Sequence, residues 1–149
     1  MFYTYRLFFK GDILMDEIFK YTLSDAYGID AMQEITILDT KENNVIVVDA
    51  SGNTEEYTLE YGDIEMIKST ILDYSDIFEV EELDTPPILD GVTNEIVVYN
   101  DGEPHTIKTE NLGYWDLDDP IAPELKAVLE VIYTISGTLD EYGVELFLE

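Results

Sequence analysis

Residue types that commonly catalyse reactions are scarce in this sequence, carboxylates excepted. The chain has no cysteine and one histidine, His105, which excludes disulfides, thiolate catalysis and zinc–cysteine sites. No serine or cysteine nucleophile motif accompanies His105, and no phosphate-binding motif of the G-x-x-x-x-G-K or G-x-G-x-x-G type occurs. We therefore predict that the protein is not an enzyme, that it has no catalytic residues and that it needs no cofactor.

Carboxylates are the abundant chemical group. A pair of carboxylates at the right separation can hydrolyse a glycosidic bond. Because the chain has 34 acidic residues, some pair will lie at that separation in any fold. The pairing of carboxylates therefore does not indicate glycosidase activity here.

One stretch partly matches a calcium-binding loop. Four residues fit positions 1, 3, 5 and 12 of the EF-hand pattern: Asp49, Ser51, Asn53 and Glu60. The sixth position, where the pattern needs glycine, is Thr54, and the flanking residues predict strands instead of helices. A second oxygen-rich group lacks the glutamate at the twelfth position: Asp116, Asp118 and Asp119. We predict no dedicated metal site, and weak cation binding remains an alternative.

The excess of negative charge is the strongest chemical feature. The chain has 149 residues, of which 34 are acidic and 7 basic, giving a formal net charge of −27. A hydrophobic content of 46% indicates a folded chain despite this charge. Nucleic acids and anionic membranes are disfavoured as direct partners, since both are bound through Lys and Arg. A basic protein, a cationic peptide or metal ions fit the charge.

Acidic residues are densest between Ser69 and Thr106, a stretch with no Lys or Arg. They alternate with apolar residues such as Ile77 and Val80, and a buried unpaired carboxylate is costly. We therefore expect the carboxylates to face outward and to form one anionic surface. The partner-binding acids predicted here are Asp73, Asp76, Glu79, Glu81, Glu82 and Asp84.

An acidic loop with two aromatic residues supplies the second part of the predicted surface. Tyr114 and Trp115 precede Asp116, Asp118 and Asp119. Tyrosine and tryptophan are common interface anchors, and an aromatic ring among acids suits arginine through a cation–π contact. We predict that all five residues bind the partner. The alternative for Trp115 is that it packs beneath the last helix.

The first half of the sequence predicts an antiparallel β-meander. Short segments rich in β-branched and aromatic residues are separated by turn residues. The predicted strands are Phe2–Lys10, Glu17–Leu23, Glu34–Asp39, Val45–Asp49 and Glu56–Tyr61. Val45–Asp49 is almost wholly apolar, so we expect a central strand, whereas Glu56–Tyr61 has the alternation of a half-buried strand.

The second half predicts two helices and a hairpin. Helical spacing of isoleucines indicates a helix at Asp63–Tyr74 with Asp63 as its N-cap. The last helix is predicted at Pro120–Ser136, with Asp119 as N-cap and Gly137 at the C-terminal cap. Further predicted elements are an edge strand at Ile77–Val80, a hairpin of Thr93–Tyr99 with the edge strand Glu103–Thr109, and a helix or strand within Thr138–Glu149.

These elements predict one α+β domain covering residues 1–149. Its sheet should hold about six or seven antiparallel strands, including the C-terminal-half hairpin, packed against two main helices. No run approaches the roughly 20 apolar residues of a membrane span. The apolar N-terminus is interrupted by Arg6 and Lys10, which argues against a secretion signal. We expect a cytoplasmic protein.

In charge, size and lack of catalytic motifs, the chain resembles nucleic-acid-mimicking inhibitors, among them anti-CRISPR and other phage anti-defence proteins. The resemblance is one of composition across the whole chain. It implies a non-enzymatic inhibitor whose carboxylates engage the Lys and Arg of a groove that otherwise binds phosphates. The partner would be a basic, nucleic-acid-binding enzyme. The alternatives are an immunity protein that neutralises a basic nuclease toxin, and an acidic housekeeping protein or weak Ca²⁺ binder.

Overall fold

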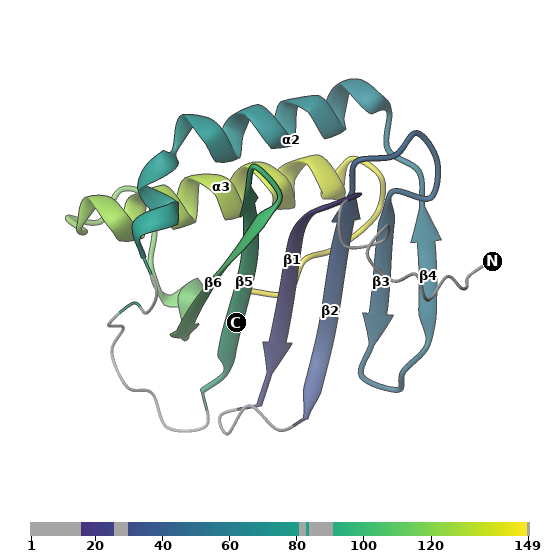
Figure 1. Cartoon of the computed structure of the whole chain (residues 1–149). Helices are drawn as coiled ribbons and strands as arrows, with labels where there is room; N and C mark the ends of the chain where they lie inside the picture. The colour runs from purple at the N-terminus through teal and green to yellow at the C-terminus, as the bar shows by residue number, and fades with distance from the viewer. Residues whose placement is uncertain (1–15, 26–29, 81–82, 84–90, 149) are drawn as a thin grey trace.

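The computed structural model describes residues 16–25, 30–80, 83 and 91–148. Within these ranges the chain forms a six-stranded antiparallel sheet with two helices on one face, as Figure 1 shows. This confirms the predicted α+β fold. The predicted strand Phe2–Lys10 lies outside the described residues, as do Glu81, Glu82 and Asp84.

The sheet combines a meander with a hairpin. Its strand order is β4-β3-β2-β1-β5-β6, with every neighbouring pair antiparallel. The strands are β1 (Glu17–Ser24), β2 (Ala31–Leu38), β3 (Val45–Asp49), β4 (Thr54–Tyr57), β5 (Thr93–Asn100) and β6 (Glu103–Glu110). The chain leaves one edge of the sheet at β4, passes over a face through a helix, and returns beside β1 as β5.

Strand alternation places one apolar row of side chains under the helices. Phe19, Tyr21 and Leu23 of β1 are buried, whereas the residues between them are only partly so. In β5 the buried positions are Asn94, Ile96 and Val98. On the other side of these strands no described helix packs, and we refer to this side as the open face of the sheet. It carries the ion-paired residues Lys20, Glu34, Glu95 and Lys108.

Two long helices and two short 3₁₀ turns form the second layer. They are α2 (Tyr61–Asp73), η1 (Ser75–Glu79), η2 (Leu112–Tyr114) and α3 (Pro123–Asp140). Ile64, Ile67 and Ile71 recur at helical spacing and are buried, as predicted for α2. The helices run in opposite directions: the end of α2 shares a pocket with the start of α3, and Tyr142 after α3 contacts Asp63 in the first turn of α2.

Two strand predictions were wrong in detail. Ile77–Val80 is not an edge strand: η1 covers Ile77, whose backbone N–H donates to the carbonyl of Tyr74 (3.0 Å). Four residues with little periodicity cannot distinguish a turn of helix from a short strand. Val45–Asp49 is not central either, because β3 lies between β2 and the edge strand β4. Its continuous apolar run reflects side chains that are half-buried on the open face.

The predicted strand Glu56–Tyr61 is shortened by a side chain. The amide of buried Asn44 accepts from the Leu59 N–H (2.8 Å) and donates to the Leu59 carbonyl (3.0 Å). Asn44 thus replaces a strand partner at Leu59, and β4 ends at Tyr57. Helix α2 then begins at Tyr61 with Glu60 at its N-cap, in place of the predicted Asp63.

The last helix begins and ends later than predicted. Ala122 is its N-cap and Pro123 its first residue, while Asp119 accepts a hydrogen bond from the Asp116 N–H (2.9 Å) in the preceding loop. Gly137 lies inside the helix. The helix is terminated by Gly143 at φ +78°, where left-handed backbone favours glycine, in a Schellman arrangement.

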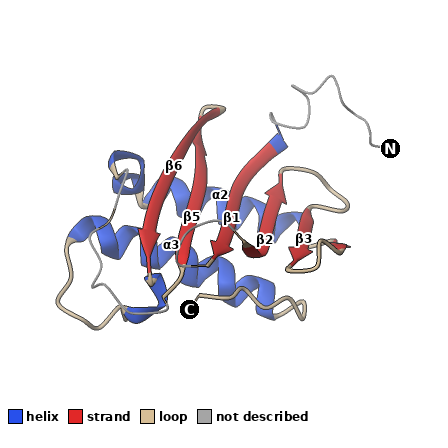
Figure 2. Cartoon of the chain, turned by 90° about the horizontal axis from the view of Figure 1, so that it is seen from below, coloured by secondary structure: helices blue, strands red, loops and turns tan. Residues whose placement is uncertain are grey.

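The C-terminal tail, residues 143–148, is neither helix nor strand. It turns back after α3 and runs along the helix-bearing side of the sheet (Figure 2). Gln33 of β2 holds it twice, donating to the Glu145 carbonyl (2.8 Å) and accepting from the Phe147 N–H (2.9 Å). The Tyr21 hydroxyl donates to the Phe147 carbonyl (2.7 Å). Side chains of the sheet thus form the hydrogen bonds to the tail's backbone that a neighbouring β-strand would otherwise form.

Candidate acidic interaction surface

The first predicted cluster of acids is exposed at the end of α2. Asp73 is the last residue of this helix, and Asp76 and Glu79 lie on η1, all three with exposed side chains. The last turn of α2 contains no basic residue. A carboxylate at a helix C-terminus faces the negative end of the helix dipole, which costs about 0.3–1 kcal/mol at low salt. Asp73 therefore opposes the stability of its own helix.

The same unfavourable placement recurs in α3. Asp140 is the last residue of α3 and Glu141 follows it, and the last turn again contains no basic residue. Both side chains are exposed. Two long helices therefore end in carboxylates where Lys or Arg would stabilise them. The carboxylates at these positions do not stabilise the helices that they terminate.

The cluster adjoins the start of α3. A cavity of about 240 Å³ separates the two helix ends and is lined by Asp73, Asp76 and Lys126, among others. The Tyr74 hydroxyl donates to Glu130 Oε2 (3.1 Å) and so ties the end of α2 to α3. Of the described lysines, Lys126 is the one beside these acids, and it makes no ion pair within the described ranges.

The second predicted cluster divides into an exposed and a packed part. Tyr114 is 57% exposed and meets Trp115 edge-to-face, with ring centroids 5.2 Å apart. Trp115 packs against the core, and its Nε1 is buried with no acceptor among the described residues. Its carbonyl accepts from the Tyr133 hydroxyl of α3 (2.8 Å). Trp115 is therefore partly packed beside α3, as the alternative prediction stated. Of the two aromatic residues, Tyr114 has the ring that is exposed to solvent.

Segments of both clusters are bonded to α3. Glu130 contacts the α2 side through Tyr74, and Tyr133, one turn later, contacts the loop side through Trp115. Burial and the charges of Asp116 and Asp119 raise the pKa of Tyr133. Asp116 and Asp118 are exposed and Asp119 is half-buried. The fold therefore places both predicted clusters along α3, although they are distant in sequence.

Tyrosine hydroxyls donate to several carboxylates of the described residues. Tyr61 donates to Asp39 (2.7 Å), and Tyr142 donates to Asp63 (2.5 Å). The other hydroxyl–carboxylate pairs are Tyr57 with Glu55, Tyr74 with Glu130, and Tyr99 with Glu17. A neutral donor satisfies the carboxylate oxygens and leaves the negative charge in place, unlike Lys or Arg. The composition already indicates such pairs, with 11 tyrosines against 7 basic residues, but the sequence analysis did not predict them.

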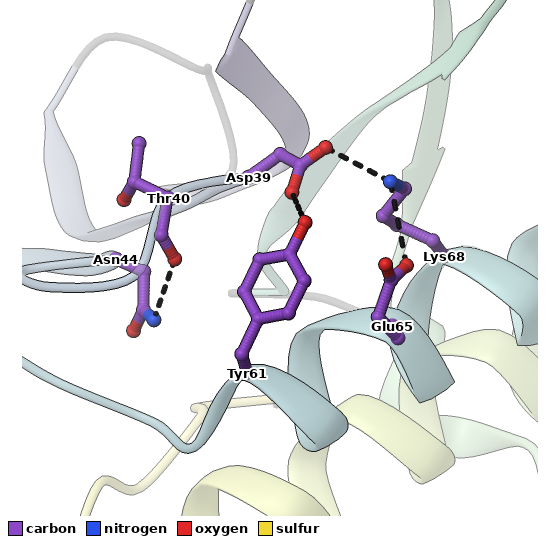
Figure 3. Close-up of polar contacts among 6 residues, drawn as sticks. All are labelled: Asp39, Thr40, Asn44, Tyr61, Glu65 and Lys68. Carbon is purple, nitrogen blue, oxygen red and sulfur yellow. Dashed lines mark hydrogen bonds and ion pairs between the residues drawn. The ribbon is translucent and has the colours of Figure 1, made fainter.

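One network does contain a cation and joins α2 to the sheet, as Figure 3 shows. Lys68 Nζ lies 2.8 Å from Asp39 Oδ2 and 3.4 Å from Glu65 Oε2. Hydrogen bonds from Lys68 and then Tyr61 lower the pKa of Asp39. The bond to Asp39 likewise raises the pKa of Lys68. Asp39 follows directly after β2, so this network fixes the position of α2 on the sheet.

The remaining ion pairs of the described residues lie on the open face of the sheet. Lys20 pairs with Glu34 (3.5 Å), and Lys108 pairs with Glu95 (3.9 Å). Their side chains are about one-third to two-thirds exposed, so each pair adds little stability. The pairs nevertheless neutralise charge on that face. On the helix-bearing side, Lys68 and Lys126 are the only cations of α2, η1 and α3.

The calcium-like pattern folds as a hairpin turn. Asp49 Oδ1 accepts from the Ser51 and Asn53 N–H groups (2.9 and 3.0 Å), and Gly52 adopts φ +85°. Backbone amides thus occupy the oxygen that a cation would need. Within residues 16–25, 30–80, 83 and 91–148, no group of three or more His, Asp and Glu side chains is arranged to hold a metal ion.

His105 has a structural position on β6. Its Nε2 contacts the carbonyl of Val80, and its ring meets Phe78 edge-on with centroids 6.3 Å apart. These contacts attach the segment after η1 to the edge of the sheet. Among the described residues, no serine or carboxylate contacts this ring.

Comparison of the chain with known protein-family models and with curated protein sequences found no match. Among the described helices, none combines the length and apolar character required to cross a bilayer.

Proposed function

We propose that this protein is a non-enzymatic, cytoplasmic inhibitor that presents carboxylates to a basic nucleic-acid-binding enzyme. The proposed contact surface runs along α3. It comprises Asp73 at the end of α2 with Asp76 and Glu79 on η1, and Tyr114, Asp116 and Asp118 between β6 and α3. Spaced carboxylates on a rigid layer can occupy the Lys and Arg side chains of a groove that otherwise binds a phosphate backbone.

The placement of acids at helix C-termini is the observation that carries this proposal. Asp73 and Asp140 stand where they weaken the helices they terminate, and no basic residue offsets them there. Residues that lower stability at exposed sites are typical of function, because function and stability are often in conflict. Tyrosine donors support the same interpretation, since they order carboxylates without neutralising them.

A matched pair of charge-reversal variants tests the proposal. The surface variant is Asp73→Lys, Asp76→Lys and Glu79→Lys. The control variant carries the same charge change on exposed residues away from α3: Glu42→Lys, Glu56→Lys and Glu103→Lys. A partner is first captured from lysate, identified, purified, and assayed for association with each variant across a salt series.

We expect the captured protein to bind nucleic acid, and duplex DNA to compete with its binding. The surface variant should associate at least about tenfold more slowly than the control, because long-range attraction acts mainly on the association rate. Equal association of the two variants, or binding that salt and DNA leave unchanged, contradicts the proposal. A captured nuclease toxin would assign the same surface to an immunity protein.

A further inference from the structure

A second feature lies toward the other edge of the sheet, where the C-terminal tail passes the β3–β4 hairpin. A pocket of about 210 Å³ opens between them. Its walls include Val47, Tyr57 and Phe147, and its polar groups include the carboxylates of Asp49, Glu55 and Glu145. We refer to it as the tail pocket. None of the residues predicted to bind a partner lines it.

The tail wall of this pocket is held rigidly. Gly143 reverses the chain after α3, and buried Val144 and Leu146 anchor the tail in the core. Gln33, itself 4% exposed, bonds the Glu145 carbonyl and the Phe147 N–H. The side chains of Glu145 and Phe147 therefore alternate with the buried residues and are exposed. A wall fixed in this way loses little entropy when a ligand binds.

The sheet wall carries three side chains on the helix-bearing face. Glu55 pairs with Val47 and Tyr57 with Val45 across the β3–β4 ladder, so both point to the side where Val45 is buried. Asp49, the last residue of β3, also points to this side of the sheet, as its pairing with β2 shows. Helix α3 ends at Asp140, and beyond it the tail residues Gly143, Val144, Glu145 and Phe147 line the pocket together with β3 and β4.

The charge of the tail pocket is not compensated by a cation among the described residues. Asp49, Glu55 and Glu145 make no ion pair with any described residue. Glu55 accepts from the Tyr57 hydroxyl (3.3 Å), which leaves its charge intact. Asp49 accepts from two backbone amides through one oxygen, Oδ1. Unpaired carboxylates at the rim and two aromatic side chains in the walls are complementary to a cation with a flat, apolar body.

We propose that the tail pocket binds an arginine side chain of the basic partner. A guanidinium is planar, stacks on aromatic rings and is more weakly hydrated than an ammonium group, and its donors can serve two carboxylates at once. This proposal rests on the proposed function and adds to it a specific contact on the β3–β4 side of the molecule. Arginine buried there would anchor one point of an interface that is otherwise held by dispersed charge.

Peptide titrations followed by amide NMR test this directly on the full chain. The probe is a short glycine peptide with one arginine, compared with the same peptide carrying lysine or citrulline, which has the shape of arginine without its charge. We expect the arginine peptide to shift the amides of Glu55, Tyr57 and residues 143–148, and the citrulline peptide to shift none of them. Equal responses to arginine and citrulline, or to arginine and lysine, overturn the assignment.

Two double variants with the same loss of charge separate the pocket from the general field of the protein. Glu55→Gln with Glu145→Gln should weaken arginine-peptide binding about tenfold, since two charge-assisted contacts are lost. Glu56→Gln with Glu141→Gln removes exposed neighbours that do not line the pocket, and binding should change less than about twofold. Equal weakening by both pairs overturns the proposal.

A Phe147→Ala variant provides an independent test, because the tail is held through the Phe147 backbone and not through its ring. Arginine binding should weaken while the tail amides keep their protection from hydrogen exchange in the free protein; unchanged binding contradicts the proposed stacking. The proposed function is tested separately through Asp73, Asp76 and Glu79. Failure of the tail-pocket tests alone, with those charge reversals still impairing partner association, would leave the proposed function standing.

Discussion

Replacing Gln33 by methionine should measure how strongly the tail is held to the sheet. Methionine has a similar length and can fill the buried space, but it can neither donate to the Glu145 carbonyl nor accept from the Phe147 N–H. Each of the two lost hydrogen bonds has a net contribution to stability of about 1 kcal/mol. Leaving the partly buried backbone groups unsatisfied adds to the loss. We expect the free energy of unfolding to fall by about 2–4 kcal/mol.

The assay is thermal and urea unfolding followed by circular dichroism. For a chain of this length, 1 kcal/mol corresponds to a melting-temperature change of about 2–4 °C, so Gln33→Met should lower Tm by roughly 4–16 °C. Met32→Gln at the neighbouring exposed position is the control and should leave Tm nearly unchanged. If Gln33→Met lowers Tm by less than about 2 °C, the side chain does not fasten the tail, and the rigid wall of the tail pocket loses its basis.

Three further outcomes follow from the contacts. Asn44→Ala should lower the free energy of unfolding by about 3 kcal/mol in urea titrations, since buried Asn44 bonds both backbone groups of Leu59 and the Thr40 carbonyl; a loss below about 1 kcal/mol contradicts this role. Lys68 and Tyr61 lower the pKa of Asp39, so its stabilising contribution is present above the unfolded pKa of about 3.9 and lost as pH falls through the lowered value. The stability difference between wild type and Asp39→Asn should therefore shrink on acidification, and a constant difference refutes the pairing. Added NaCl should raise Tm by screening the net charge of −27; calorimetry showing no rise would mean that self-repulsion is small.

The fold could be predicted where a periodic pattern was long enough to identify its face. The isoleucine spacing in α2 predicted the buried side chains that the structure shows. Boundaries failed where a distant group decided them. The Asn44 side chain bonds Leu59 and so ends β4. Asp119 accepts a hydrogen bond within the preceding loop instead of capping α3. Such choices depend on tertiary contacts that local propensity does not contain.

The exposure of Asp73, Asp76 and Glu79 could be predicted from the cost of burying an unpaired carboxylate. Their proximity to α3 could not, because it depends on how the end of α2 meets a helix much later in the chain. The tail pocket was equally invisible. Glu55 and Glu145 are brought together by the path of the tail, and that path is set by Gln33 and Gly143.

The central claim is that the acids beside α3 recognise a basic partner through charge. The most direct measurement is the association rate of the purified partner with the Asp73→Lys, Asp76→Lys, Glu79→Lys protein and with the Glu42→Lys, Glu56→Lys, Glu103→Lys protein, at low and physiological salt. Our account predicts a slowing of at least about tenfold for the first protein relative to the second at low salt, with the gap narrowing as salt rises. Indistinguishable rates at every salt concentration would contradict it.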